Sequence, residues 1–267
     1  MCRLLGIVSS EPTEFRIILQ EAPRSLAALS REHRDGWGIA IFDSKHSLAE
    51  WRLYKAIGCA AEDEEFGRLA GAAGEVMISH IRRRTVGAVS MANTHPFRSG
   101  RWVFAHNGTI HEHGYLRSST SARRLDEMKG NTDSELFFAY LLTELDAAGV
   151  SCTPASPETD FVLRRATRVL CSSSTVGAAN FLLSDGTTMY AHRCGRTLFV
   201  LDRGPEDPVR EVRRSRDGAI LVTPWPQDRQ AVLVASEAMT DEPWTELQER
   251  DLLRIDRAPT PRWRRLA

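Results

Sequence analysis

The sequence has no excess of charge of either sign and no long hydrophobic run. Lysine plus arginine and aspartate plus glutamate both number 35, so the formal net charge is zero. This balance argues against a chain that coats nucleic acid or an anionic membrane surface. No apolar run approaches the roughly 20 residues that cross a bilayer, and the start lacks the apolar segment of a signal peptide. We therefore expect a cytoplasmic globular protein with no nucleic-acid or membrane partner.

The sequence also lacks paired cysteines. Its cysteines are odd in number and widely spaced, with no Cys-x-x-Cys pair: Cys2, Cys59, Cys152, Cys171 and Cys194. Such spacing fits neither a disulfide framework nor a cysteine-rich zinc site. We expect most of them to be buried apolar side chains, and we expect no metal and no cofactor. Cys2 is the exception because of its position.

Hydrophobic patterning predicts strands, then helices, then strands again. The expected strands cover 2–9, 36–42, 49–56, 75–82, 101–107, 179–185, 188–194, 197–203, 219–224 and 231–237, with turns at Asp185–Gly186 and Asp217–Gly218. The expected helices cover 14–29, 62–73, 134–149 and 157–171. This order favours a layered α+β domain with two sheets and helices outside them. Because no repeat or linker interrupts the chain, we expect one domain over 2–267, with a frayed tail over 255–267.

Cys2 follows the initiator methionine, and this position gives its thiol a chemistry that an internal cysteine lacks. A small second residue permits removal of Met1, after which Cys2 carries a free α-amine beside its thiol. Such an amine has a reference pKa of about 7.7–8.0, which suits it to accept the thiol proton at neutral pH. A nucleophile activated by an N-terminal amine is a known catalytic arrangement. The alternative is that Cys2 is a chance small residue at the start of a strand.

Further polar residues stand at the ends of predicted elements. Asn107 and Gly108 end a strand and could supply N–H groups to an oxyanion, although Asn-Gly is also typical of a hairpin turn. Arg82 could hold a carboxylate with two hydrogen bonds, or it could lie in a solvated basic loop. Asp133 begins a helix, where a capping role alone would explain it.

Short motifs in a fixed order connect these positions: MCRLLG at 1–6, HRDGWG at 33–38, SHIR at 79–82, NTHPF at 93–97, AHNG at 105–108 and TDSE at 132–135. With them the chain resembles the class II, or N-terminal nucleophile (Ntn), glutamine amidotransferases over residues 2–240. The late segment ASEAMTDEPW at 235–244 makes it similar to the stand-alone branch that includes γ-glutamyl hydrolases of glutathione and ergothioneine metabolism. The resemblance implies the Ntn-hydrolase fold, a four-layer αββα sandwich of two mostly antiparallel sheets with helices outside.

The resemblance also implies catalytic roles. Cys2 would be the nucleophile, and its own α-amine would be the general base. Asn107, together with the backbone N–H of Gly108, would hold the oxyanion. The implied reaction is hydrolysis of the γ-glutamyl amide of glutamine, or of a larger γ-glutamyl compound, through a thioester on Cys2.

The implied substrate-binding residues complement an amino-acid head group. Arg82 would bind the α-carboxylate, and Asp133 would pair with the α-ammonium group. Thr85 lies on the same loop as Arg82, and His106 would line the pocket. One arginine and one aspartate are the smallest complement to a zwitterion, and they would position the substrate without touching the nucleophile.

Two other functions stay open at this point. One is a metal-dependent hydrolase built on His95, His106, His111 and His113, although no carboxylate or cysteine supports their spacing beyond Glu112. The other is a catalytically idle partner subunit that binds γ-glutamyl compounds. The chain has no room for a fused synthase, so the expected acceptor is water or a separate ammonia-accepting or peptidase subunit.

Overall fold

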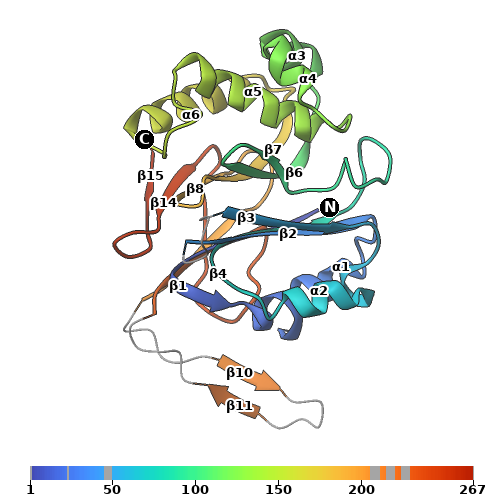
Figure 1. The fold of residues 1–267 in the computed structure, drawn as a ribbon, viewed down its shortest axis with the longest axis vertical. Helices are drawn as coiled ribbons and strands as arrows, with labels where there is room; N and C mark the ends of the chain where they lie inside the picture. Colours follow the sequence, from blue (N-terminus) through green and yellow to red (C-terminus); the bar gives the residue numbers. More distant parts are fainter. Residues whose placement is uncertain are drawn as a thin grey trace.

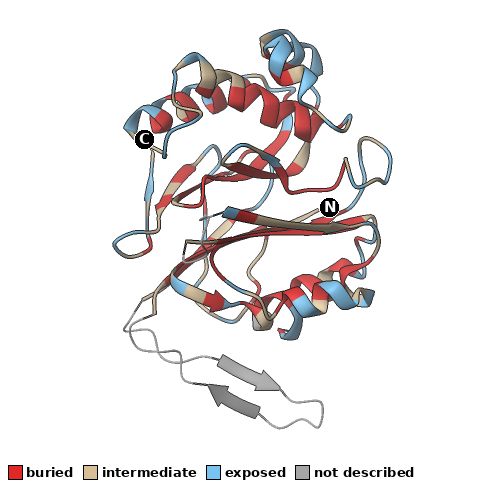
Figure 2. Cartoon of the chain, viewed as in Figure 1, coloured by how far each residue is buried: buried red, intermediate tan, exposed pale blue. Residues whose placement is uncertain are grey.

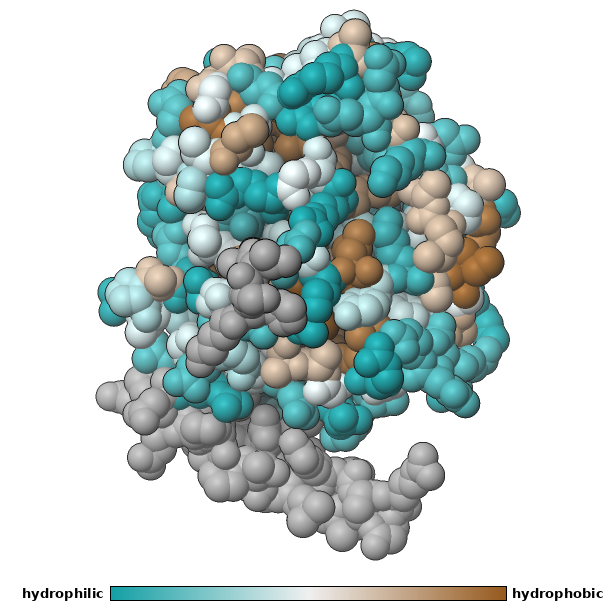
Figure 3. Space-filling view, in the orientation of Figure 1, coloured by the Kyte–Doolittle hydropathy of each residue, from teal (hydrophilic) through white to brown (hydrophobic). Residues whose placement is uncertain are grey.

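The computed structural model of the chain describes residues 2–22, 24–44, 50–204, 211–214, 220–223 and 229–266. The fate of Met1 and the expected turn at Asp217–Gly218 lie outside these residues. Within them, no helix is both long enough and apolar enough to cross a membrane. On the face drawn in Figure 3, hydrophobic residues form separate patches on a mainly hydrophilic surface.

Two antiparallel sheets form the centre of the molecule (Figure 1). The first has the strand order β13-β9-β12-β1-β4-β2-β3, and the second has the order β15-β14-β8-β7-β6-β5. The strands of the first sheet are β1 (Arg3–Glu14), β2 (Gly36–Asp43), β3 (Glu50–Ala56), β4 (Ala73–Arg82), β9 (Phe199–Arg203), β12 (Ala231–Ala235) and β13 (Thr245–Glu246). Those of the second are β5 (Phe97–Ser99), β6 (Trp102–Ile110), β7 (Gly177–Ser184), β8 (Thr188–His192), β14 (Leu252–Asp256) and β15 (Arg262–Arg265). Two further strands, β10 (Glu211–Arg214) and β11 (Ile220–Thr223), pair with each other.

Helices lie on the outer side of each sheet (Figure 1). The first sheet is covered by a π-helix (Ile17–Glu21), α1 (Leu26–Ser30), a 3-10 turn (Ala60–Glu62) and α2 (Glu64–Leu69). The second is covered by α5 (Asp133–Ala147) and α6 (Pro157–Leu170), with α3 (His113–Ser119) and α4 (Ala122–Asp126) beside α5. The layers are therefore helix, sheet, sheet and helix. The predicted α+β fold, a four-layer sandwich with antiparallel sheets inside, is confirmed.

Side-chain alternation along the strands divides the buried apolar residues among three interlayer cores. On β1, Leu5 and Ile7 pack toward α1 and α2, whereas Leu4 and Val8 pack between the two sheets. Phe104 on β6 packs toward the helices on the other side. Successive side chains of a strand point to opposite faces, so a strand covered on both faces is apolar at nearly every position. Figure 2 shows the result as strands that are mostly buried in both sheets.

The segment 14–29 is not the single helix that its spacing predicted. β1 continues as far as Glu14, which pairs with Ala73 of β4. The residues that follow form the π-helix and then α1, whose N-terminus is capped by Ser25 through a hydrogen bond from the Ala28 N–H. Pro23 stands between the two helices in the sequence, and proline lacks the N–H that a continuous helix requires.

The expectation of a frayed tail over 255–267 is wrong. Residues Arg262–Arg265 form β15, which pairs with β14 at the edge of the second sheet. The indole N–H of Trp263 donates to Asp202 at 2.6 Å, and the Leu266 N–H donates to the Leu252 carbonyl at 2.8 Å. The contact between Trp263 and Asp202 spans 61 positions, a sequence distance that local patterns do not reveal. Together these contacts fasten the end of the chain to both sheets.

The loop at 93–96 passes directly over β2, and one glycine makes this possible. A Cβ atom at Gly38 would collide with the carbonyl oxygen of His95 and lie 2.9 Å from the ring of Pro96. Gly38 pairs with His80 on β4, and the rings of His80 and His95 are 4.2 Å apart. The absent side chain at position 38 therefore lets this loop lie beside the end of β4.

We expect the change Gly38→Ala to destabilise the protein, because the added methyl group must displace the backbone of the 93–96 loop. Overpacking of this kind costs about 1–3 kcal/mol of the free energy of unfolding. Gly114→Ala in α3 is the matched control, since no atom lies within 4 Å of a Cβ added there. Urea unfolding should separate the two variants. Equal stability would contradict the close contact between this loop and β2.

Candidate functional site

A small cavity lies where β1 begins and β4 ends. It is lined by Cys2, Arg82, Arg83, Thr85, Val86, His95, His106, Gly108, Thr132, Asp133 and Ser134. Six of the seven predicted site residues are in this set, and Asn107 is the one that is not. The cavity volume is about 20 Å³, which is room for one water molecule.

The register between β1 and β4 brings the first residues beside Arg82. Arg3 pairs with Ile81, and the two strands run in opposite directions. The start of β1 therefore lies next to the end of β4, although Cys2 and Arg83 are 81 positions apart. β6 and the first turn of α5 contribute the other wall of the cavity.

The thiol of Cys2 is half-buried and contacts the backbone of Arg83. The Arg83 N–H donates to the sulfur at 3.2 Å, and the thiol donates to the Arg83 carbonyl at 3.2 Å. Burial raises the pKa of the Cys2 thiol, and the hydrogen bond from the Arg83 N–H opposes this shift only in part. The thiol is therefore protonated at neutral pH and needs a base to become a nucleophile.

Asn107 is linked to the strand of Cys2 through a residue that the site prediction did not include. Its side-chain amide donates to the hydroxyl of Ser236 at 3.2 Å. The same hydroxyl accepts the Leu4 N–H at 2.9 Å, and the Ser236 N–H donates to the Leu4 carbonyl at 3.1 Å. The only sequence signal for Ser236 was its place in the late motif at 235–244. One N–H of the Asn107 amide is engaged in this way, and an amide carries two.

At Gly108 the strands β6 and β7 approach each other closely. A Cβ at position 108 would collide with the carbonyl group of Ala178 and lie 2.9 Å from Nε2 of His106. Glycine is thus the residue that the pairing of the two strands admits. Gly108 also lines the cavity beside Cys2, and without a side chain it does so with its backbone.

Arg82 extends from the end of β4 and is bonded to its own loop. Its guanidinium donates to the carbonyls of Val86 and Ala88, each at 3.1 Å. A guanidinium has five N–H donors, so donors remain for a ligand. The next part of the loop is held by Asp35, which accepts the Arg84 N–H at 2.8 Å.

Asp133 lies in the first turn of α5, but it is not the N-cap. Thr132 has that role, since its hydroxyl accepts the Glu135 N–H at 3.1 Å. One carboxylate oxygen of Asp133 accepts the Ile110 N–H at 2.8 Å. Thr85 lines the same cavity as Asp133, and its hydroxyl accepts a hydrogen bond from the Thr109 hydroxyl at 3.1 Å.

His106 lines the cavity with both ring nitrogens engaged. Nε2 lies 3.0 Å from the Ala178 carbonyl oxygen, which can only accept, so Nε2 carries the proton. Nδ1 then accepts from the hydroxyl of Ser134 at 2.8 Å. Burial lowers the pKa of His106, which keeps the ring neutral. The ring therefore braces the first turn of α5, next to Asp133.

Three other histidines near the site are buried, and of these only His95 was considered from the sequence, as a metal ligand. His33, His80 and His95 have no hydrogen-bond partner among the described residues. Burial lowers the pKa of His33 to about 4 and that of His80 to about 3, and it holds that of His95 well below its ordinary value. All three rings are therefore uncharged at neutral pH.

A larger cleft lies elsewhere, between β3 and α5. Its volume is about 970 Å³, and its lining includes Lys55, Phe97, Arg124, Glu135 and Phe138. It shares no lining residue with the cavity at Cys2. Burial lowers the pKa of Lys55 to about 8, but among the residues that line the cleft there is no cysteine and no histidine. The smaller cavity at Cys2 is therefore the candidate active site.

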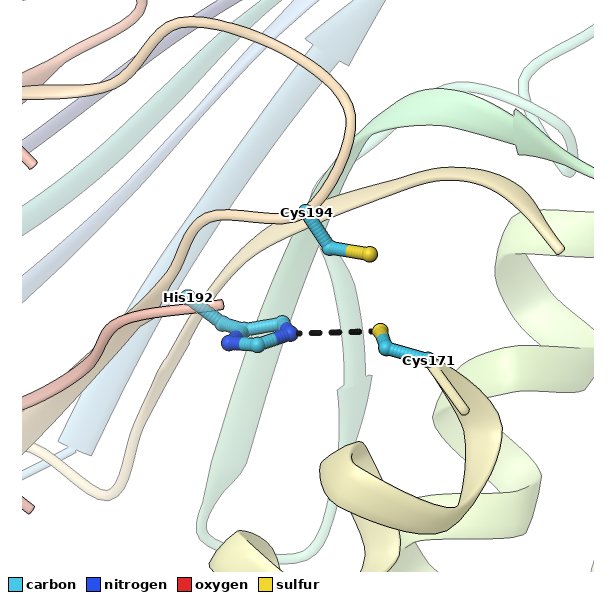
Figure 4. A group of neighbouring side chains, drawn as sticks. All are labelled: Cys171, His192 and Cys194. Carbon is cyan, nitrogen blue, oxygen red and sulfur yellow. Dashed lines mark hydrogen bonds between the residues drawn. The ribbon is translucent and has the colours of Figure 1, made fainter. Parts of the chain in front are cut away.

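The four histidines of the metal-hydrolase alternative do not come together. His95 and His106 are buried, whereas His111 and His113 are exposed. Across the described ranges, the one group of three metal-binding side chains within mutual reach is Cys171, His192 and Cys194. The spacing of the cysteines along the sequence did not reveal this group, which the fold assembles from separate elements (Figure 4).

Comparison with known proteins agrees with this geometry. The family of class II glutamine amidotransferases matches residues 1–260 of the chain. A protein of Haemophilus influenzae, provisionally named a glutamine amidotransferase, is 28% identical over 263 residues, which cover 93% of this chain and 82% of the relative.

Solved structures give the same result. A provisionally named glutamine amidotransferase from Pseudomonas aeruginosa has a TM-score of 0.65 at 25% identity, and 99% of each chain is covered. The glutamine phosphoribosylpyrophosphate amidotransferase of Bacillus subtilis shares the fold, with a TM-score of 0.62 at 18% identity over 99% of this chain and 49% of that one. The chain belongs to the class II glutamine amidotransferases.

Proposed function

We propose that this protein hydrolyses the γ-glutamyl amide bond of glutamine, or of a larger γ-glutamyl compound, through a thioester on Cys2. The observation that carries the proposal is the cavity that unites the Cys2 thiol with the guanidinium of Arg82 and the carboxylate of Asp133. An α-amino acid head group has both charges. A site with one partner for each charge is suited to hold that end while the γ-amide lies at the thiol.

The proposed reaction has two halves. The Cys2 sulfur attacks the γ-carbonyl carbon, and its proton passes to the α-amine of the same residue once Met1 has been removed. The oxyanion of the tetrahedral intermediate would accept from the Gly108 N–H and from the free amide N–H of Asn107. The C–N bond then breaks, and ammonia or an amine leaves with the proton. Water attacks the thioester in the second half and releases glutamate.

The α-amine is the base that suits this reaction. His33 and His80 have pKa values of about 4 and 3, and His95 is also shifted far down, so these rings are weak bases at neutral pH. His106 uses both nitrogens within the protein. An N-terminal amine has a reference pKa of about 7.7–8.0, close to the operating pH at which a general base is most effective.

The cavity has to enlarge before a substrate can bind. A volume of about 20 Å³ admits one water molecule and no amino acid. The 83–96 segment connects β4 to β5 without a strand or helix of its own, and it supplies several of the lining residues. Movement of this loop, with Arg82 exchanging a loop carbonyl for the substrate carboxylate, would open the site. Water, or the substrate of a separate subunit, would be the acceptor, and the reaction would take place in the cytoplasm.

The first prediction tests the nucleophile. Cys2→Ala should abolish ammonia release from glutamine and cleavage of γ-glutamyl peptides, because no other thiol lines the cavity. Cys152→Ala is the matched control, since Cys152 is an exposed free cysteine. The two substrates assayed side by side also identify the preferred leaving group. Retention of more than a few per cent of wild-type turnover in Cys2→Ala would overturn the proposal.

The second prediction tests the head-group clamp. Arg82→Ala and Asp133→Asn should each reduce kcat/KM by roughly 10- to 100-fold, the effect of losing a charge-assisted hydrogen bond worth about 1.5–3 kcal/mol. Glutamine analogues that lack the α-amine should lose a similar factor on the wild type, yet lose little more on Asp133→Asn. Arg84→Ala is the control on the same loop. Additive losses for the analogue and Asp133→Asn would contradict the assignment of Asp133.

The third prediction distinguishes the base. If the α-amine accepts the proton, kcat/KM should fall about tenfold per pH unit below roughly pH 7.5. A His33 base, with a pKa of about 4, would leave kcat/KM flat to well below pH 6. The substitution His33→Gln should leave the position of the acidic limb unchanged. A protein with a stable N-terminal tag has no such amine, and full activity of that protein would refute the mechanism.

A further inference from the structure

Three metal-binding side chains lie together at the end of α6, apart from the cavity at Cys2. Cys171, His192 and Cys194 place one nitrogen and two sulfurs within 4.8 Å of one another, and all three residues are buried. Figure 4 shows the two thiols and the imidazole pointing toward a common centre. None of the three lines the cavity at Cys2.

The backbone around the cluster holds these side chains in place. Cys171 is the C-cap of α6, and its N–H donates to the Thr167 carbonyl at 2.9 Å. The Cys194 N–H donates to the side chain of buried Asn180 at 2.8 Å, and the Cys194 carbonyl accepts the Ala179 N–H at 2.8 Å. The helix layer and the second sheet therefore each contribute a fixed thiol.

The imidazole of His192 is oriented as a metal ligand requires. Nδ1 lies 2.9 Å from the carbonyl oxygen of Asp251, and a carbonyl can only accept, so Nδ1 carries the proton. Nε2 then presents its lone pair to Cys171 Sγ, 3.6 Å away. Metal-bound histidines commonly donate their other N–H to a backbone carbonyl in this way, which fixes the tautomer and the ring plane.

The distance between these two atoms fits a tetrahedral zinc ion. Zn–S bonds of about 2.3 Å and Zn–N bonds of about 2.0–2.1 Å give a sulfur–nitrogen edge of roughly 3.6 Å in a tetrahedron. The charge also fits the burial. Two thiolates and one neutral imidazole cancel the charge of a divalent cation, so the loaded cluster would add no net charge to the interior.

We propose that Cys171, His192 and Cys194 form a structural zinc site that joins the C-terminus of α6 to the end of β8. Binding releases the two thiol protons to solvent and forms two Zn–S bonds and one Zn–N bond. A non-protein ligand such as water completes the tetrahedron. The site acts on stability and lies outside the catalytic cavity, so this proposal does not depend on the proposed hydrolase activity.

Cobalt titration of the reduced protein tests the site directly. We expect one equivalent of Co²⁺ to produce the sulfur-to-cobalt charge-transfer band of a tetrahedral thiolate site, and Zn²⁺ to abolish it. Cys171→Ser, Cys194→Ser and His192→Gln should lose or strongly weaken the band. Cys59→Ser, at a buried cysteine outside the cluster, and Cys2→Ala should retain it. No band in the wild type, or a band lost only in Cys2→Ala, would overturn the proposal.

A second measurement separates metal binding from misfolding of the variants. Zinc should raise the thermal midpoint of the wild type and of Cys59→Ser, because a ligand that binds only the native state stabilises it. The same addition should leave the midpoint of folded Cys171→Ser unchanged. If Cys171 and Cys194 instead form a disulfide that persists in reductant, the cluster is a covalent crosslink and the zinc proposal is wrong.

Discussion

The antiparallel pairing of β1 with β4 is the contact on which the candidate site depends. Arg3 opposite Ile81 sets the register, and this places Cys2 against the backbone that leaves Arg82. A slip of one residue would exchange the faces of Leu4 and Leu5 and turn the polar end of each strand out of the cavity. The apolar core between the sheets, to which Leu4 and Val8 belong, opposes such a slip.

The second sheet completes the site through polar bridges. Ser236 joins the Leu4 backbone to the amide of Asn107, and His106 joins Ser134 to the Ala178 carbonyl. The buried histidines around these bridges stay neutral, so the fixed charges at the cavity are those of its arginines and Asp133. A neutral, protonated thiol therefore lies between the groups that would hold a zwitterion. The proposed α-amine supplies the base that this environment otherwise lacks.

Local patterns predicted most of the elements that form the sheets and the long helices. The alternation at 36–42 and 49–56 anticipates the β2–β3 hairpin, and the helices expected over 134–149 and 157–171 correspond to α5 and α6. The prediction of a single helix over 14–29 is wrong because β1 extends to Glu14 by pairing with β4, which is a tertiary effect. The prediction of a frayed tail is wrong because β15 pairs with the neighbouring strand β14 and is also held by Asp202, which is 61 positions from Trp263.

In the candidate site, too, local motifs identified some residues, whereas long-range contacts determine others. Cys2, Arg82, Gly108 and Asp133 stand in recognisable motifs, and the fold brings all four to one cavity. The link from Asn107 to Ser236 spans 129 positions, so no local pattern could reveal it. The cluster of Cys171, His192 and Cys194 was missed because the spacing of cysteines along the chain does not report which strand and helix ends meet.

Capture of the covalent intermediate tests the central claim most directly. The protein would be mixed with a γ-glutamyl substrate under single-turnover conditions, quenched in acid within the first turnover, and examined by peptide mass spectrometry. The account predicts one γ-glutamyl group on the N-terminal peptide, attached to the sulfur of Cys2 and removed by hydroxylamine. Turnover with Cys2 unmodified, or with the glutamyl group on another side chain, would contradict it.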